Sequence, residues 1–103
     1  MAEHPIRGVV YRMDLGHGAK PWLVVSNNHR NRALDTVVVV RVTTTSKPLP
    51  TRVDLAHDDP LAGQVLCDDV EQVYADELGE RLGALSRSSM GRVGEGLRLA
   101  LDR

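Results

Sequence analysis

The sequence predicts a mainly β protein: a small, strongly bent antiparallel sheet or barrel, closed by one C-terminal helix. Three observations support this fold class. The apolar content is carried by Val and Leu with no Phe, short apolar runs are separated by Gly and Pro turns, and only the last segment has helical periodicity. A chain of 103 residues can bury one core but not two, so we expect a single domain over residues 1–103.

The first strand is expected at residues 7–14, where Val9, Tyr11 and Met13 recur with the two-residue period of a half-buried strand. A short loop with two glycines and a proline follows. Residues 22–26 are apolar on both faces and therefore predict a central strand.

Residues 27–35 are rich in Asn and Arg and are expected to form a polar connection. Residues 36–45 predict the strongest strand of the chain, because β-branched side chains dominate it and no breaker interrupts it. The two-residue period places Val37, Val39, Arg41 and Thr43 on one face of this strand.

The second half of the chain predicts shorter strands and a helix. Residues 51–56 predict a short strand, and residues 63–75 a longer one with a bend near Asp68 and Asp69. Residues 76–85 supply a turn and a last short strand.

The C-terminal segment predicts a helix capped by Ser86, whose hydroxyl can accept a hydrogen bond from a free backbone N–H. Three internal glycines each cost about 1 kcal/mol relative to Ala in a helix, so this helix requires tertiary or subunit packing. Its apolar stripe consists of Met90, Val93, Leu97 and Leu101.

Composition limits the cellular setting. The single Cys67 excludes an internal disulfide and fits a reducing cytosol, and no segment resembles a membrane span or a signal peptide. We therefore expect a cytoplasmic protein without membrane association. Cys67 could act as a nucleophile only beside a histidine, and a small buried apolar role is the better interpretation.

The net charge of −1 hides an asymmetry between the two halves of the chain. Residues 1–52 carry eight cations and three anions, whereas residues 53–103 carry five cations and eleven anions. The basic half is what a protein that faces a polyanion would show. The alternative is that the two halves attract each other and expose their charges to solvent.

Signatures of metal and nucleotide-cofactor chemistry are missing, so we expect no metal and no cofactor. What remains is a set of polar groups at strand ends. If the second and third strands are neighbours, the Lys20 cation and the Thr43 hydroxyl converge at one edge of the sheet. Such groups could stabilise the negative charge that develops on phosphorus when a ribose 2′-hydroxyl attacks it. Alternatively, Lys20 is a solvated turn lysine and the threonines belong to an ordinary edge strand.

The order of motifs resembles the MazF/PemK toxins of toxin–antitoxin systems. The resemblance spans almost the whole chain and rests on RGVVYRMDLG, KPWLVVSNN, TVVVVRVTTT, KPLPTRV, QVLCDDVEQV and LGERLGALS, in that order. It implies a small SH3-like barrel similar to that of the gyrase toxin CcdB, with a C-terminal helix, and a homodimer. The implied activity is metal-independent, sequence-specific cleavage of single-stranded RNA to a 2′,3′-cyclic phosphate and a 5′-hydroxyl. The implied partner is a cognate antitoxin whose acidic C-terminal tail occupies the RNA groove.

Carried over by position, the family's catalytic basic residue, usually Arg, falls on Lys20 and its catalytic Thr on Thr43. His17 is the candidate acid or base, although a loop histidine can equally be a surface bystander. Trp22 could stack a base, but its place in an apolar strand favours packing. The residues expected to contact RNA are Arg7, Gly18, Ser26, Asn27, Asn28, Thr44, Thr45, Asp68 and Asp69.

Two other functions are compatible with the same fold. One is a toxin that poisons a protein target such as gyrase by binding it. The other is a non-catalytic interaction module, since Lys20 stands where the family usually has Arg, and the opening Arg7-Gly8-Val9 lacks the family's acid.

Overall fold

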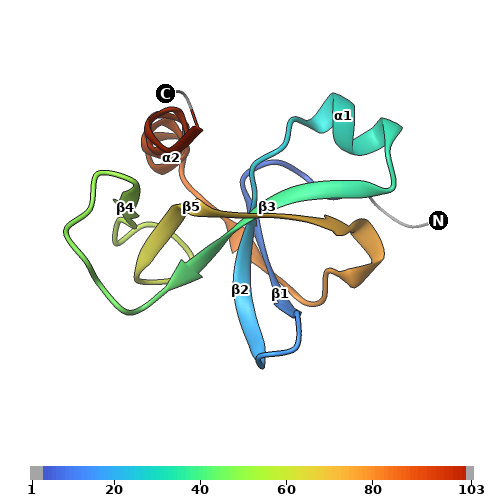
Figure 1. Cartoon of the computed structure of the whole chain (residues 1–103), viewed down its shortest axis with the longest axis horizontal. Coiled ribbons are helices and arrows are strands. Elements are labelled where there is room, and N and C mark those ends of the chain that lie inside the picture. The colour runs from blue at the N-terminus through green and yellow to red at the C-terminus, as the bar shows by residue number, and fades with distance from the viewer. Residues whose placement is uncertain (1–3, 102–103) are drawn as a thin grey trace.

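The computed structural model describes residues 4–101 and shows six strands in one antiparallel sheet with two helices (Figure 1). The sheet order is β4-β5-β3-β2-β1-β6. The elements are β1 (Val9–Asp14), β2 (Ala19–Val24), α1 (Asn28–Ala33), β3 (Thr36–Thr43), β4 (Arg52–Asp54), β5 (Gln64–Tyr74), the 3-10 turn η1 (Ala75–Glu77), β6 (Arg81–Ala84) and α2 (Arg87–Leu101).

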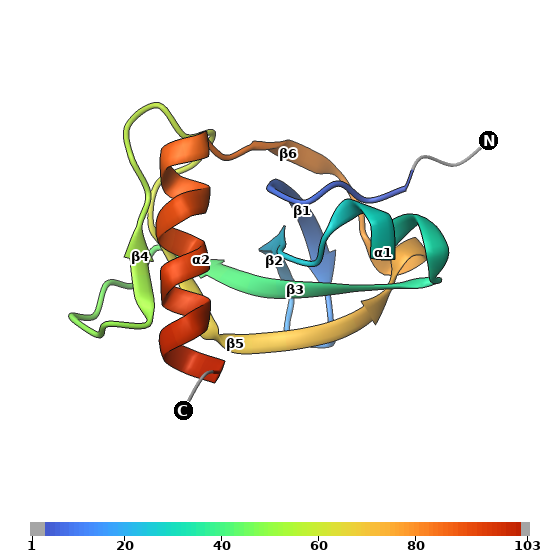
Figure 2. The ribbon, with the colours of Figure 1, turned by 90° about the horizontal axis from the view of Figure 1, so that it is seen from above.

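The sheet curls into a half-barrel, which confirms the predicted fold class. Figure 2 shows the strands bending around a shared interior, with α2 across the β4–β5 end and α1 at the opposite end. Part of the curl comes from an irregularity in β5. Val40 of β3 pairs with Val70, whereas the next residue, Arg41, pairs with Leu66, so β5 carries extra residues between them. The predicted bend near Asp68 and Asp69 is therefore confirmed.

Alternate residues of the central strands supply two hydrophobic clusters on the two faces of the sheet. Val40 and Val42 of β3 belong to one cluster, together with Cys67. Val37 and Val39 belong to the other, together with Trp22, Val24 and Met13. Buried side chains on both faces of β2 confirm that this strand is central.

Helix α2 covers the first of these clusters. The Ser86 hydroxyl accepts a hydrogen bond from the Ser89 backbone N–H at 3.1 Å, so the predicted N-cap is confirmed. Val93 is fully buried and Met90 packs against the same cluster. Leu101 remains 67% exposed and does not complete the predicted stripe.

The loop before β5 is fastened to the start of α2 by Asp59. Its carboxylate accepts hydrogen bonds from the backbone N–H groups of Ala56 and Ser86 and from the Ser89 hydroxyl. Burial alone would raise the pKa of Asp59, but the hydrogen bonds outweigh burial and lower it. The ionised carboxylate therefore holds the β4–β5 loop and α2 together.

The prediction that residues 27–35 form a polar connection is wrong in part, because residues 28–33 form α1. The helix lacks an apolar stripe and is held by amides instead. The Asn27 side chain accepts a hydrogen bond from the Arg30 backbone N–H at 2.8 Å and caps the helix. Asn31 is buried and bonds the Ser26 hydroxyl at 2.6 Å, so α1 is attached to the chain beside β2.

Strand bounds differ from the predicted ones at several ends. β2 begins at Ala19 and ends at Val24, where 22–26 was expected, so Lys20 lies on the strand. Pro21 is tolerated because the ladder to β3 begins only at Trp22, and Pro21 has its backbone partner in β1 alone. β3 ends at Thr43, which leaves Thr44 and Thr45 in the following loop.

Candidate active site

The site lies where β2 begins and β3 ends. Trp22 of β2 pairs with Arg41 of β3 in antiparallel register. That register, continued by two residues, sets Lys20 opposite Thr43, and the two-residue period keeps all four side chains on one face. This register brings Lys20 and Thr43 together as predicted. Both residues line one cavity.

This cavity, called the cationic pocket here, has a volume of about 320 Å³. It carries two cations and two hydroxyls, and none of its lining residues is acidic. The pocket is therefore suited to an anion with several oxygens, such as a phosphate. Its lining residues are Lys20, Pro21, Arg41, Val42, Thr43, Thr44, Leu61 and Ala62.

A second cavity of about 270 Å³ adjoins the first and shares Lys20 and Arg41 with it. This mixed pocket adds two carboxylates, those of Asp69 and Glu71, and the His17 imidazole. Hydrogen-bond donors and acceptors therefore line the same cavity. Its lining residues are Leu15, His17, Gly18, Lys20, Trp22, Arg41, Asp69 and Glu71.

Local hydrogen bonding orients the Thr43 hydroxyl. The Thr45 backbone N–H donates to Thr43 Oγ1 at 3.1 Å. Because the oxygen accepts from the backbone, its own proton is left to donate to a ligand. Gln64, the strand partner of Thr43, supports this end of the sheet by bonding the Lys47 backbone at 3.0 Å and the Asp54 carboxylate at 2.8 Å.

The β1–β2 loop presents His17 at the mixed pocket. Asp14 Oδ1 accepts hydrogen bonds from the backbone N–H groups of Gly16 at 2.7 Å and Gly18 at 3.1 Å. Both glycines have positive φ, 108° and 92°, which lets the loop turn within a few residues. His17 is exposed and lines the mixed pocket but not the cationic one, so its role as acid or base stays a prediction.

Neither shared cation has an acidic partner among the residues that the structure describes. The two ion pairs found in residues 4–101 are Arg12 with Glu80 and Arg98 with Glu95. In the same part of the chain, the buried Arg41 Nε and the Trp22 indole nitrogen have no hydrogen-bond partner. Positive charge at this end of β2 and β3 is therefore available to a ligand.

Four of the predicted RNA-contacting residues lie elsewhere, around α1. Asn28 Oδ1 accepts from the Arg7 backbone N–H at 2.7 Å, and the Arg7 guanidinium donates to the Val25 carbonyl at 3.0 Å. Ser26 is buried and Asn27 caps the helix. None of the four lines the cationic or the mixed pocket, and their part in RNA binding stays a prediction.

The other predicted RNA contacts are divided between the site and its margins. Thr44 lines the cationic pocket, and Gly18 and Asp69 line the mixed pocket. Thr45 is exposed and anchors Thr43 through its backbone. Asp68 is exposed on β5 and lines neither pocket.

Arg41 and Glu71 line the site but are not among the predicted catalytic or RNA-contacting residues. Arg41 is the one charged residue of a strand otherwise built from Thr and Val, two positions before Thr43, and this pattern could have identified it. Glu71 had no local signal, because only the pairing of β5 with β3 brings it to the site.

Cys67 and Trp22 have the packing roles that were favoured for them. Cys67 is fully buried, and burial, reinforced by the charge of Asp68, raises the pKa of its thiol to about 11. Trp22 is only 6% exposed, within the second hydrophobic cluster. Its buried ring is therefore not free to stack a base.

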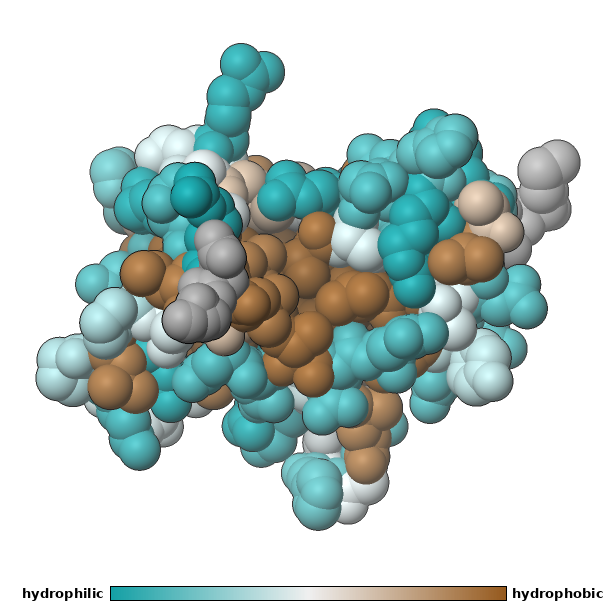
Figure 3. All heavy atoms as spheres, turned by 45° about the horizontal axis from the view of Figure 1, so that its top comes forward, coloured by the Kyte–Doolittle hydropathy of each residue, from teal (hydrophilic) through white to brown (hydrophobic). Residues whose placement is uncertain are grey.

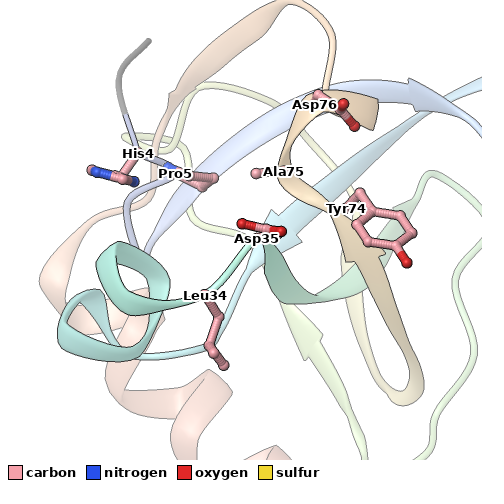
Figure 4. A pocket seen from close by; sticks show the side chains of 7 residues that line it. All are labelled: His4, Pro5, Leu34, Asp35, Tyr74, Ala75 and Asp76. Carbon is pink, nitrogen blue, oxygen red and sulfur yellow. The ribbon is translucent and has the colours of Figure 1, made fainter. Parts of the chain in front are cut away.

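A separate cavity of about 340 Å³ lies at the far end of the sheet (Figure 4). Asp35 and Asp76 contribute its charges, His4 lies in its lining, and Tyr74 projects from the end of β5. The cavity has no Lys or Arg in its lining and does not suit an anion. Across residues 4–101, no group of three or more His, Cys, Asp or Glu side chains could hold a metal ion.

The fold and the site together define a class of protein: a small β half-barrel with a C-terminal helix and a cationic, hydroxyl-lined pocket where two central strands begin and end. Comparison with known proteins makes this specific. Residues 6–101 match the model of the PemK-like, MazF-like toxins of type II toxin–antitoxin systems. The chain belongs to this family, and the resemblance seen in the sequence is confirmed.

Curated relatives and solved structures agree with this assignment. The chain is 50% identical over 97 residues to endoribonuclease MazF4 of Mycobacterium tuberculosis and to endoribonuclease MazF1 of Mycobacterium bovis, covering 94% of this chain and 92% of each relative. A mycobacterial endoribonuclease solved in complex with its cognate antitoxin is 50% identical, with a TM-score of 0.92 and 94% of each chain covered. A MazE–MazF structure from Deinococcus radiodurans, 22% identical, shares the fold with a TM-score of 0.85, covering 98% of each chain.

Proposed function

We propose that this protein is the toxin of a toxin–antitoxin system and acts as an endoribonuclease that cleaves single-stranded RNA. The observation that carries the proposal is the cationic pocket, where Lys20 and Thr43 meet without an acidic residue in the lining. Membership of the toxin family and the two relatives named as endoribonucleases support it.

The chemistry that the pocket suits is transfer of the phosphoryl group within the RNA. A ribose 2′-oxygen attacks phosphorus, a new 2′-O–P bond forms and the P–O5′ bond breaks. The products are a 2′,3′-cyclic phosphate and a 5′-hydroxyl. The Lys20 ammonium offsets the negative charge that builds on the phosphate oxygens, while the Thr43 hydroxyl donates a hydrogen bond to one of them. No metal takes part in this mechanism.

The two proton transfers require a base for the 2′-hydroxyl and an acid for the 5′-oxygen. Candidates lie in the adjoining mixed pocket, where His17, Asp69 and Glu71 meet. A His17→Ala variant that keeps the wild-type pH dependence of cleavage would assign both transfers to the carboxylates or to water.

The proposal is tested by incubating the purified protein with a long RNA of mixed sequence in the presence of EDTA. We expect the wild type to cut the RNA at defined sites, and Lys20→Ala and Thr43→Ala each to lower the cleavage rate by about 10²-fold or more. Lys47→Ala is the matched control, since Lys47 is exposed and lies outside the lining of the cationic pocket.

Two outcomes would count against the proposal. Intact RNA with the wild type, combined with growth arrest through a protein target such as gyrase, would favour a binding toxin. Undiminished cleavage by both Lys20→Ala and Thr43→Ala would show that the active site is not in the cationic pocket. Annealing a complementary strand should protect the RNA, because its bases must be unstacked to be read.

The protein is also proposed to bind a cognate antitoxin through an acidic segment that enters the cationic pocket. Lys20 and Arg41 support this, because neither has an ion-pair partner among residues 4–101 and a carboxylate chain can compete there with RNA phosphates. An antitoxin that binds Lys20→Glu and Arg41→Glu variants as tightly as the wild type would exclude this mode.

We expect the protein to act in the cytoplasm. None of the helices among residues 4–101 is long and apolar enough to cross a membrane. Recovery of the protein in the membrane fraction of lysed cells would contradict this expectation.

A further inference from the structure

Arg41 lies at the centre of the site. It lines both the cationic pocket and the mixed pocket, and Lys20 is the one other residue in both linings. It pairs with Trp22 across the β2–β3 ladder and stands two residues before Thr43 on the same face of β3. Any phosphate in the cationic pocket would therefore lie beside its guanidinium.

The strand fixes the backbone position of Arg41. The neighbours of Arg41 along β3, Val40 and Val42, are buried in the hydrophobic core at 0% and 1% exposure. β3 is also paired on both sides, by β2 and by β5. The backbone from which the Arg41 guanidinium projects is therefore ordered before a ligand arrives.

No internal partner neutralises Arg41 among the described residues. Asp69 and Glu71 line the same mixed pocket, but neither forms an ion pair with it. Its Nε is buried without a hydrogen-bond partner. A half-buried guanidinium without a counterion is costly to maintain, so the arrangement favours an anionic ligand in the pockets that Arg41 lines.

We propose that Arg41 is a third catalytic residue, which binds the scissile phosphate of the RNA directly. Its planar guanidinium offers two parallel N–H donors to the non-bridging oxygens, a geometry that the point charge of Lys20 cannot provide. Lys20 and Thr43 then complete the contacts to the same phosphate. This inference rests on the proposed function, because it assigns a role within RNA cleavage.

The test compares Arg41→Lys and Arg41→Gln with wild type and with Arg12→Lys. Arg12 is the matched control: it is an arginine on the neighbouring part of the same sheet, exposed, and outside both pocket linings. The cut site is first mapped on a long RNA of mixed sequence. Steady-state cleavage is then measured on a short RNA oligonucleotide that spans this site, after thermal melts show that each variant is folded.

We expect Arg41→Lys to lower kcat by about 10- to 100-fold with little change in KM, and Arg41→Gln to lower it further, because the lost contacts strengthen in the transition state. Arg12→Lys should stay within about twofold of wild type, since exposed surface charges contribute little.

A second readout identifies the contact itself. The oligonucleotide is made with sulfur in place of one non-bridging oxygen at the cut, in the Rp or the Sp form. Wild type should cleave one form more slowly than the other, because sulfur is the weaker acceptor, and Arg41→Lys should lose this selectivity.

The outcomes separate the two proposals. RNA left intact by the wild type would overturn the proposed function, and the role of Arg41 with it. Efficient cleavage by the wild type and by both Arg41 variants would overturn the role of Arg41 alone. Variants that cut at normal rates but at other sequences would show that Arg41 reads a base, which also overturns phosphate binding.

Discussion

At the scale of single residues, the position of Thr43 depends on a glycine across the sheet. Gly63 precedes Gln64, the strand partner of Thr43, and has φ +127°. A Cβ built at Gly63 would lie 2.2 Å from the Thr43 carbonyl oxygen, which is backbone and cannot move aside alone. The close approach at this position therefore excludes any side chain.

We expect Gly63→Ala to lower the free energy of unfolding by roughly 2 kcal/mol or more, through the left-handed φ and the clash together. Cleavage should fall as well, because Thr43 must shift. Urea denaturation and the RNA assay measure the two effects. Gly16→Ala isolates the backbone cost of about 1 kcal/mol, since φ there is +108° and no atom lies within 4 Å of the added Cβ. Equal losses of unfolding free energy in Gly63→Ala and Gly16→Ala would show that the clash with the Thr43 carbonyl does not contribute.

At the scale of elements, α2 packs closely against the sheet through one of its glycines. A Cβ at Gly96 would lie 2.7 Å from the Cys67 sulfur and 3.2 Å from a methyl group of Val53. A Cβ at Gly91 would meet no atom within 4 Å. Glycines that look equally unfavourable in the sequence thus differ, because Gly96 lets the helix approach β4 and β5.

The two positions are expected to respond to alanine with opposite signs. Gly91→Ala should raise the free energy of unfolding by about 1 kcal/mol, the difference in helix propensity. Gly96→Ala should lower it by about 1–3 kcal/mol through overpacking. Adding Cys67→Ala to Gly96→Ala should restore part of the loss by removing the contacted sulfur. Thermal or urea unfolding of wild type, Gly96→Ala, Cys67→Ala and the double variant measures this coupling. If the free-energy changes of the two single variants add up to that of the double variant, the contact between position 96 and the Cys67 sulfur is contradicted.

At the scale of the whole molecule, the charge asymmetry of the chain is only weakly satisfied internally. Among residues 4–101, Arg12 with Glu80 is the one ion pair that joins the two halves, and both side chains are about half exposed or more, at 49% and 71%. Such a pair contributes little to stability. Mutual attraction of the halves therefore does not account for the basic first half, and the unpaired Lys20 and Arg41 agree with a polyanion as partner.

We also propose that the protein is a homodimer, as its resemblance to the family implies. Apolar residues gather on the face between α2 and α1 (Figure 3), and Leu99 and Leu101 at the end of α2 are 61% and 67% exposed. Light scattering should give twice the chain mass of 11.3 kDa at micromolar concentration. A mass of one chain across the concentration range would exclude the dimer.

Much of the fold could be predicted because its signals are local. The valine run marks β3, two-residue alternation marks β1, and Ser86 marks the start of α2. Helix α1 was missed because it has no apolar stripe: amide hydrogen bonds from Asn27 and the buried Asn31 hold it, and these depend on packing beside β2. Propensity and periodicity contain no information of that kind.

By itself the sequence determined the family, the mainly β class, the cap of the last helix and the two strand ends that carry Lys20 and Thr43. Only the tertiary structure decided that these ends share a pocket with Arg41, and that Asp69 and Glu71 face them from β5. It also placed Ser26 and Asn28 with α1, away from that pocket. The reason is physical: a period of two assigns each side chain to a face, but the register between strands and the curl of the sheet decide which distant side chains meet.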